Sequence, residues 1–282
     1  MAPSSYKAYL AAWRNFVNFA HSHNLPSLLP IPIDHLLCYI TFLANKGRAF
    51  ASLSTIVSAI SYFHKLDGVP DPTKTFKFQQ LLAALKRSHH SVDLRLPMTH
   101  DILKRILGKL DNSSLAHYER MLFKAMFLLA FHFGLRLGEI TQSPHNLSWD
   151  SIILSSRSLK LTFQSFKHAV GPPVTHKVVG SGSVLCPVAA MASFLGVRGQ
   201  RPGPLFLLGG AAVKRHMFNG ILKSLLRQCG IQGRITSHSF RIGAATWWSQ
   251  LNYSQTQIKR LGRWKSNAFL KYLRGPVVHP VG

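Results

Sequence analysis

The sequence predicts a mostly helical protein with one small β-sheet, an α+β fold arranged as two domains. Helical periodicity of apolar residues runs through residues 1–90 without a change to strands. β-branched runs and alternation appear at about 152–179, which predicts a short sheet there. Because 46% of the 282 residues are hydrophobic, the chain can bury a core in each of two domains. We expect one domain over 1–90 and a second over 91–282.

Four helices are expected in the first domain. The earliest begins with a serine cap and places Tyr6 and Trp13 on one face. The third has Ser52 or Ser54 as its cap, and a glycine follows both the second and the third, as at many helix ends. The four helices are expected over 4–24, 30–47, 52–68 and 70–90.

A polar, basic stretch separates the two domains. Residues 88–97 show no apolar periodicity and are interpreted as a linker. Its basic residues are compatible with a solvated tether or with a strap across a phosphate backbone. The tether is the default interpretation of a short charged segment.

The second domain opens with helices and returns to helices after the sheet. Thr99 is expected to cap the first of them. A short extended piece is expected at 203–208. The helices are expected over 99–111, 116–135, 186–199, 211–231, 237–251 and 254–264.

The charge of the chain predicts a polyanionic partner. The net charge is +25 and the pI is near 10.7. Residues 151–282 contain 18 Lys and Arg residues and no Asp or Glu, whereas residues 1–150 contain 16 and all 9 acidic residues. Metal ions that act on phosphates are held by several carboxylates. The second half therefore argues against a two-metal nuclease or transposase and favours a nucleic-acid binder or a metal-free enzyme acting on nucleic acid.

The cysteines and histidines predict no metal site and no cofactor. Cys38, Cys186 and Cys229 are scattered and form no CxxC pair. The longest apolar stretch, 121–135, is interrupted by a lysine and a histidine, so we expect a buried helix and no membrane association. No basic-then-apolar leader opens the chain, which favours a reducing compartment that contains nucleic acid.

Three short motifs together supply the residues for chemistry at a phosphodiester. GLRLGE contains Arg136, HSFR contains His238 and Arg241, and LGRWKSNAFLKY contains Trp264 and Tyr272. Arginine stays charged and its planar fork bonds two phosphate oxygens without a metal. Such a site also needs a nucleophile and an acid for the leaving oxygen. The motifs therefore predict a metal-free phosphate clamp with a phenol directed at it.

In this order and with these separations, the motifs resemble those of the tyrosine recombinase (phage integrase) family, and the likeness covers nearly the whole chain. The stretch LGRWKSNAFLKYLR is most similar to eukaryotic members carried by mobile elements, the DIRS-like and Crypton types. The resemblance implies a helical core-binding domain and a mixed catalytic domain of the integrase type. It also implies that DNA is cut and rejoined through a covalent 3′-phosphotyrosyl intermediate, without metal ions or ATP.

The resemblance assigns a role to each motif residue. Arg136 and Arg241 match the two catalytic arginines of the family, and His238 matches the histidine of its H-x-x-R motif. Tyr272 matches the nucleophile. Trp264 matches a position held by histidine in many bacterial members and by tryptophan in Cre-type members. An indole N–H donates one hydrogen bond but does not shuttle protons.

Further residues are assigned supporting or alternative roles. Glu139, one helical turn after the first arginine, is expected to brace it. The separation between the tryptophan and the tyrosine is one residue shorter than in the family, so Arg263 is an alternative for the tryptophan position. Lys167 falls where the family has a mobile β-hairpin lysine that acts as the acid, with Lys160 and Lys177 as alternatives.

The expected partner is double-stranded DNA, bound by four chains on two sites as the resemblance implies. Strand exchange needs two duplexes, each cut on both strands, and each chain offers one nucleophilic tyrosine. The expected location is the nucleus, or the nucleoid if the chain is prokaryotic. Basic residues of the first domain are the candidates for phosphate contacts: Lys7, Arg14, Lys46, Arg48, Lys65, Lys74 and Lys77.

Three alternative functions stay open. A domesticated DNA-binding protein keeps the fold without catalysis, and an enzyme of the type IB topoisomerase kind relaxes DNA with similar chemistry. A non-enzymatic RNA binder forms no covalent DNA adduct. The complete set of reactive residues favours the recombinase interpretation.

Overall fold

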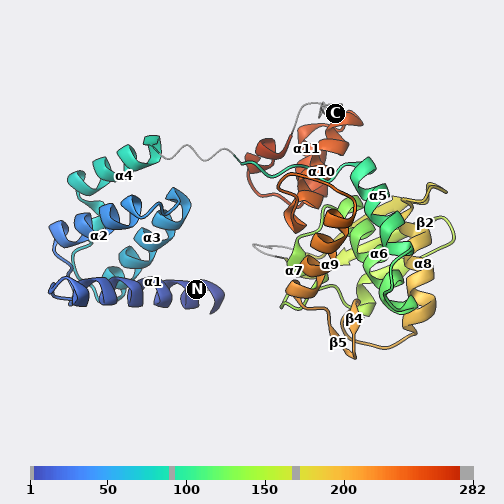
Figure 1. Cartoon of the computed structure of the whole chain (residues 1–282), viewed down its shortest axis with the longest axis horizontal. Coiled ribbons are helices and arrows are strands. Elements are labelled where there is room, and N and C mark those ends of the chain that lie inside the picture. The colour runs from blue at the N-terminus through green and yellow to red at the C-terminus, as the bar shows by residue number, and fades with distance from the viewer. Residues whose placement is uncertain (1–2, 89–92, 167–171, 274–282) are drawn as a thin grey trace. The chain divides into compact units, whose positions relative to one another are not determined.

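The structure is a computed structural model that describes residues 3–88, 93–166 and 172–273 (Figure 1). The chain divides into two compact units, Met1–Asp93 (unit 1) and Leu94–Gly282 (unit 2). The boundary expected from the sequence is slightly earlier, between residues 90 and 91. Most described residues are helical and the strands form small antiparallel sheets, so the predicted α+β class is confirmed.

Unit 1 consists of helices packed around one apolar core. Its helices are α1 (Pro3–Ser22), α2 (Ile33–Asn45), α3 (Phe50–Leu66) and α4 (Phe76–Ser88), with a short 3-10 helix, η1 (Pro72–Lys74), before α4. Large buried side chains such as Phe16, Tyr39 and Phe78 form the centre. The buried ring of His64 ties α3 to the loop before α2, because its Nε2 accepts a hydrogen bond from the Ile31 amide at 3.1 Å.

Two details of unit 1 differ from the sequence interpretation. The N-cap of α3 is Ala49, without a side-chain cap bond, and Ser52 and Ser54 both lie inside the helix. The fourth expected helix is divided into η1 and α4. The carboxylate of Asp71 accepts hydrogen bonds from the amide of Thr73 at 3.0 Å and from its hydroxyl at 2.7 Å. These local bonds favour a tight turn over a continuous helix.

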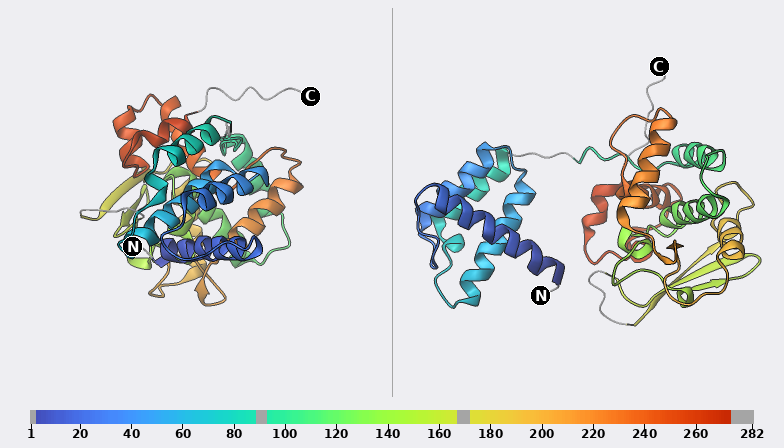
Figure 2. Two further views of the ribbon diagram at one scale, coloured as in Figure 1. Left: turned by 90° about the vertical axis from the view of Figure 1, so that its left-hand side faces the viewer. Right: turned by 60° about the horizontal axis from the view of Figure 1, so that its bottom comes forward.

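Unit 2 combines helices with a three-stranded antiparallel sheet of order β1-β2-β3 (Figures 1 and 2). Its α-helices are α5 (His100–Asp111), α6 (His117–His132), α7 (Leu137–Ile140), α8 (Pro187–Arg198), α9 (Arg215–Gln228), α10 (Ser237–Gln250) and α11 (Gln255–Leu261). The strands of the sheet are β1 (Ile152–Leu154), β2 (Ser158–Phe163) and β3 (Val174–Val179), which lie in the segment predicted to be extended. The 3-10 helices are η2 (Trp149–Ser151) and η3 (Asn267–Tyr272).

Helix α6 lies at the centre of unit 2. Its side chains from Leu122 to Phe131 are almost all buried, and it contacts α5, α8 and α10. A helix covered on several sides needs no polar face, which explains the apolar stretch at 121–135. In the part of the chain that the structure describes, no helix is both long enough and apolar enough to cross a bilayer.

The sheet packs its apolar face inward. Leu159, Leu161 and Phe163 alternate along β2 as its buried residues, as expected for a half-buried strand. Helix α8 contacts all three strands, and Figure 2 shows it beside the sheet. This packing connects the sheet to α6, since α8 also contacts that helix.

The segment between α8 and α9 differs from the expected pattern. Ala211–Ala212 forms a strand, β5, which pairs with β4 (Leu207–Leu208). Helix α9 therefore begins at Arg215 and not at residue 211. Gly209 and Gly210 both have positive φ angles and form the two-residue turn between the strands.

The end of the linker is docked on unit 2. The Leu96 amide donates to the Arg234 carbonyl oxygen at 3.1 Å, and the Met98 amide donates to the Ser239 carbonyl oxygen at 2.9 Å. The last linker residues are therefore not a solvated tether. Residues 89–92 of the expected linker lie outside the described residues.

Gly243 of α10 makes this docking possible, because a Cβ there would clash with the Met98 carbonyl oxygen. We expect Gly243→Ala to lower the free energy of unfolding by about 1–3 kcal/mol, since the clash is between two backbones. Chemical denaturation of the full chain measures the change. Gly108→Ala is the control, because a Cβ at this position of α5 meets open space and should stabilise the helix by about 0.5–1 kcal/mol. Equal midpoints for G243A and the wild type would contradict the docking.

Candidate active site

Arg136 is positioned by a sharp turn that follows α6. Gly134 has a φ of +53°, and Arg136 is the N-cap of the short helix α7. The Arg136 amide donates to Glu139 Oε2 at 2.8 Å, and its Nη1 donates to Glu139 Oε1 at 3.3 Å. The expected contact between the two residues is therefore present. The Arg136 side chain keeps 26% of its exposure, so part of the guanidinium is open to a ligand.

Glu139 is a buried carboxylate shared by two arginines. Its second partner is Arg263, whose Nη2 lies 2.7 Å from Glu139 Oε2. Burial raises the pKa of Glu139, but the Arg263 guanidinium and the Arg136 amide outweigh burial and hold that pKa below its ordinary value. Glu139 is therefore ionised at neutral pH and anchors both guanidinium groups.

The start of α10 is set by a capping box at Thr236. The Thr236 hydroxyl accepts a hydrogen bond from the His238 amide at 3.3 Å, and the Ser239 hydroxyl accepts one from the Thr236 amide at 3.0 Å. His238 and Arg241, three residues apart, therefore lie on one face of the first helical turns. This arrangement brings the H-x-x-R residues together.

The Arg241 guanidinium is buried among other cations. It donates to the carbonyl oxygens of Gly134 and Gly262, and the Trp264 ring covers it at 4.0 Å. Burial, followed by the charges of the two neighbouring arginines, lowers the pKa of Arg241 well below its usual value. An anion bound beside Arg136, Arg241 and Arg263 would relieve the repulsion between these three guanidinium groups.

Tyr272 lies against the same cluster. Its half-buried ring is 5.1 Å from the His238 ring and 6.0 Å from the Trp264 ring, measured between centroids. The Thr246 hydroxyl of α10 donates to the Tyr272 carbonyl oxygen at 3.0 Å, which ties η3 to α10. The structure therefore gathers the predicted tyrosine, histidine and tryptophan beside Arg241. Together with the three residues that hold each other next to Arg241, they form one cluster: Arg136, Glu139, His238, Arg241, Arg263, Trp264 and Tyr272.

Arg263 and Trp264, the two candidates for one position, point in different directions. Arg263 has a φ of +54°, and its side chain turns inward to Glu139. The Trp264 ring packs near Tyr272. A Cβ at Gly262 would clash with the Trp264 ring, so this turn requires a glycine. Trp264 therefore belongs to the open side of the cluster, and Arg263 belongs to its interior.

The structure does not describe the lysine that is expected to act as the acid. Lys167 lies outside the described residues. Its alternatives, Lys160 and Lys177, lie opposite each other on β2 and β3, and both are exposed. The choice among the three lysines stays a prediction.

The basic residues proposed for unit 1 all lie on its surface. Some of them have partners within the unit. Lys77 Nζ forms an ion pair with Asp34 at 2.7 Å, and Lys46 Nζ lies over the Phe42 ring at 4.4 Å. The exposed candidates are Lys7, Arg14, Lys46, Arg48, Lys65, Lys74 and Lys77. An exposed pair contributes little energy, so Lys77 can exchange Asp34 for a phosphate.

His176 of β3 is a residue of this region that the sequence interpretation missed. Its ring is buried and lies 5.7 Å from the Phe163 ring. Burial, followed by the charges of Arg263 and Arg260, lowers the pKa of His176 to about 4. The strand alternation was the available signal, because it places position 176 on the buried face.

A cationic cavity that sequence reasoning also missed lies beside the cluster. It has a volume of about 560 Å³ and is lined by Trp264 together with Lys259, Arg260 and Lys265. The sequence signal that could have indicated this positive surface was the absence of Asp and Glu after Asp150. Arg263 and Trp264 line both the cavity and the cluster, whereas Tyr272 does not line the cavity.

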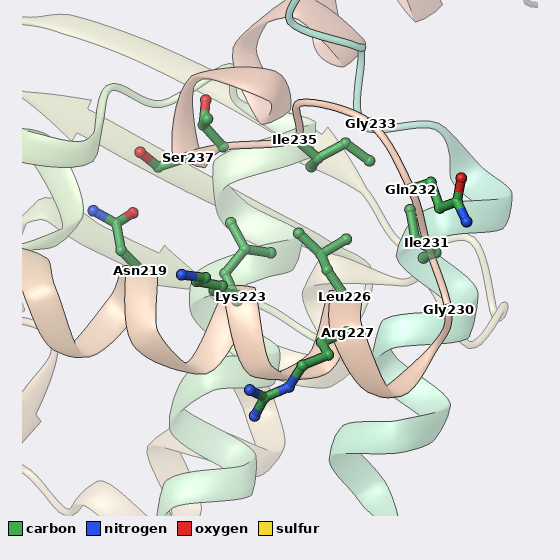
Figure 3. A pocket seen from close by; sticks show the side chains of 12 residues that line it. Asn219, Lys223, Leu226, Arg227, Gly230, Ile231, Gln232, Gly233, Ile235 and Ser237 are labelled. Carbon is green, nitrogen blue, oxygen red and sulfur yellow. The ribbon is translucent and has the colours of Figure 1, made fainter.

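A separate groove of about 710 Å³ runs along α9. Figure 3 shows Leu226, Ile231 and Ile235 among the side chains that line it. The groove reaches Ser237, next to His238, but none of the predicted site residues lines it. It is therefore a neighbour of the cluster and not part of it.

The side chains of the cluster are donors to an anion. The carboxylate of the cluster, Glu139, forms ion pairs with Arg136 and Arg263. Among residues 3–88, 93–166 and 172–273, no group of three or more His, Cys, Asp or Glu side chains could hold a metal ion. The cluster therefore offers guanidinium, imidazole, indole and phenol groups to a ligand.

A buried arginine, a half-buried arginine, a histidine and a tyrosine therefore lie together on a mostly helical domain. The chain belongs to the phage integrase (tyrosine recombinase) family, because residues 97–272 match the Phage integrase family. No curated protein matches the sequence.

Solved structures share this fold at low sequence identity. A lambda integrase dimer bound to a COC′ core site matches 97% of this chain and 72% of its own, with a TM-score of 0.66 and 17% identity. The XerH site-specific recombinase bound to palindromic difH substrate matches 94% of this chain and 75% of its own, with a TM-score of 0.68 and 13% identity. The Tn1549 transposon integrase in complex with circular intermediate DNA matches 94% and 88%, with a TM-score of 0.64 and 10% identity.

Proposed function

We propose that this protein is a site-specific recombinase or integrase that cuts and rejoins double-stranded DNA through a covalent 3′-phosphotyrosyl intermediate. The observation that carries the proposal is the Tyr272 ring beside His238, in one cluster with Arg241. Family membership supports the same chemistry. The DNA in the lambda integrase, XerH and Tn1549 integrase complexes supports DNA as the substrate.

The reaction exchanges one phosphate ester for another. Tyr272 Oη loses its proton to a base and attacks the phosphorus, while the bond from phosphorus to the 5′-oxygen breaks. The 5′-oxygen takes a proton from an acid and leaves as a hydroxyl. In the second step a 5′-hydroxyl from another strand attacks the phosphotyrosine, and the tyrosine regains its proton. Because each step forms one ester bond for each one broken, ATP is not consumed.

Each side chain of the cluster has a task in this reaction. The guanidinium groups of Arg136 and Arg241 neutralise the non-bridging oxygens as charge builds up. The imidazole of His238 is next to the Tyr272 ring and accepts or returns its proton. Trp264 donates its indole N–H to a phosphate oxygen. A lysine of the β2–β3 hairpin, Lys167 in the sequence interpretation, supplies the proton to the leaving oxygen.

The two units divide the work of binding. Unit 1 is the core-binding domain, and its exposed lysines and arginines contact phosphates. Unit 2 holds the cluster and the cationic cavity beside it.

The similarity of LGRWKSNAFLKYLR to mobile-element members supports a eukaryotic transposable element as the source and the nucleus as the location. A fluorescent fusion that stays outside the nucleus of eukaryotic cells would contradict the proposed location.

A covalent-capture experiment tests the proposal without knowledge of the target site. The full chain is incubated with a pool of random-sequence duplexes that carry one nick, so that the cleaved end diffuses away. DNA bound to protein after denaturation is then sequenced. We expect a 3′-linked adduct that is enriched for one sequence motif. A chain that binds the pool but forms no denaturant-resistant adduct is a DNA-binding protein, and the proposal is wrong.

Excess EDTA is expected to leave the rate of adduct formation unchanged within about twofold. The reason is that the described cluster neutralises the phosphate with arginines, and its only carboxylate is occupied by them. Adduct yields are compared with and without EDTA on the captured sequence. A cleavage step that requires magnesium would refute the metal-free mechanism.

The active form is expected to be four chains on two DNA sites, with a monomer in free solution. Each chain supplies one Tyr272, while strand exchange requires four cuts. Sedimentation velocity with and without the captured DNA measures both states. A stable tetramer without DNA, or strand exchange completed by a single bound chain, would contradict this expectation.

A further inference from the structure

We propose that Arg263 is a positioning residue that holds Arg136 in its phosphate-binding orientation, an inference that rests on the proposed function. Two contacts carry it. The Arg263 side chain donates from Nη2 to Glu139 Oε2 at 2.7 Å, and Glu139 in turn bonds Arg136. The Arg263 carbonyl oxygen accepts a hydrogen bond from Arg136 Nη2 at 3.1 Å. One residue therefore holds the Arg136 guanidinium from both sides.

Arg263 is itself fixed firmly enough for this task. Its Nη1 donates to the carbonyl oxygens of Phe133 at 3.2 Å and Leu261 at 3.1 Å. The Phe163 ring lies against its guanidinium at 4.0 Å. Its side chain is only 1% exposed although Arg263 lines the cationic cavity, so its guanidinium is held by protein groups and is not presented to solvent. The positive φ at this residue directs the side chain inward while its carbonyl faces Arg136.

The distances show how the charge of Glu139 is divided. The carboxylate lies 2.7 Å from Arg263 Nη2 but 3.3 Å from Arg136 Nη1. A carboxylate paired only with Arg136 would compete with the phosphate for the same donors. Because Arg263 takes the closer contact, Arg136 is oriented by Glu139 but keeps an exposed part of its guanidinium for a phosphate oxygen.

The inference predicts a specific pattern for three variants, R263Q, E139Q and the double variant R263Q/E139Q. In R263Q the Glu139 carboxylate loses Arg263, its nearer partner, and we expect both of its oxygens to pair with the Arg136 guanidinium. We expect the single-turnover rate of adduct formation at saturating protein to fall about a hundredfold, as for a misplaced catalytic group. The protein concentration at half saturation should change little, since many other cations bind DNA.

The double variant separates this role from a general loss of stability. Removing one member of a buried ion pair leaves an uncompensated charge, whereas removing both does not. We therefore expect R263Q/E139Q to recover to within about tenfold of the wild-type rate, above either single variant. Additive losses in the double variant would mean that the two residues do not act as a unit.

Arg198 offers a matched control. It is also a buried arginine, 5% exposed, and it donates to the carbonyl oxygens of Leu205, Gly199 and Pro204. Its contacts lie outside the cluster. R198Q should lower the melting temperature as R263Q does, but leave the rate per folded molecule unchanged. An equal loss of rate in R198Q would show that buried arginines act only through stability, and the inference would fail.

A crystal structure of R263Q tests the inference without any activity. We expect both Glu139 oxygens to pair with the Arg136 guanidinium in that variant. An unchanged contact between Glu139 and Arg136 would overturn the inference even if the wild type cleaves DNA. A wild type that forms no adduct refutes the proposed function, while the crystal structure still decides the positioning role.

Discussion

Tyr272→Phe is expected to abolish the covalent protein–DNA adduct while DNA binding stays within about tenfold of the wild type. The substitution removes one hydroxyl, whose hydrogen bonds contribute only about 0.5–1.5 kcal/mol to binding. The same hydroxyl is the proposed nucleophile, so without it no ester forms. The Tyr272 ring packs against His238 and Trp264, and phenylalanine keeps these ring contacts.

The measurement is the yield of denaturant-resistant adduct on the captured nicked duplex, with a gel-shift assay for binding. Tyr253→Phe is the control, because Tyr253 is 42% exposed and follows α10 outside the cluster. Its adduct yield should equal that of the wild type. An undiminished yield in Y272F would move the nucleophile to another residue.

Arg136→Ala and Arg241→Ala are each expected to reduce the cleavage rate by at least about a hundredfold, comparable to the loss of an oxyanion donor. Non-specific DNA binding should fall only slightly, because the net charge of +25 leaves many other cations to hold the duplex. The two variants are expected to differ in stability. Arg241 is buried and donates to two carbonyl oxygens, so its removal leaves unpaired groups, whereas Arg136 is partly exposed.

Cleavage rates are therefore compared per folded molecule, with melting curves for each variant. Arg241→Lys keeps a positive charge but lacks the planar fork, and we expect it to restore part of the stability but little of the rate. Arg157→Ala is the control for charge, since Arg157 is exposed in the turn between β1 and β2. If cleavage and binding fall together in R136A and R241A, the two arginines only hold the DNA.

The helices and the sheet of this chain were largely predictable because they depend on local patterns. The periodicity of unit 1 and the alternation at 152–179 repeat over many residues, and burial on one face enforces them. Not every short element was predictable. Strand β5 (Ala211–Ala212) consists of two residues that favour helix elsewhere, and its pairing with β4 overrides that preference.

The site was predictable only in its composition. The order and spacing of GLRLGE, HSFR and LGRWKSNAFLKY identified Arg136, His238, Arg241 and Tyr272 as a set. The orientation of each side chain was not predictable. Whether Arg263 or Trp264 faces Tyr272 depends on the backbone turn at residue 263, whose φ is +54°. No pattern of residue types specifies that angle for an arginine.

By itself the sequence determined the α+β class, the strong positive charge, the lack of acidic residues after Asp150 and the grouping of the motif residues as one candidate site. These properties follow from residue types and their spacing. The tertiary structure alone decided that the Glu139 carboxylate is shared by Arg136 and Arg263, that Arg241 is covered by Trp264 and that residues 95–98 dock beside α10. The physical reason is that these contacts join residues far apart in the chain, and their energies depend on distance and burial, which exist only once the chain is folded.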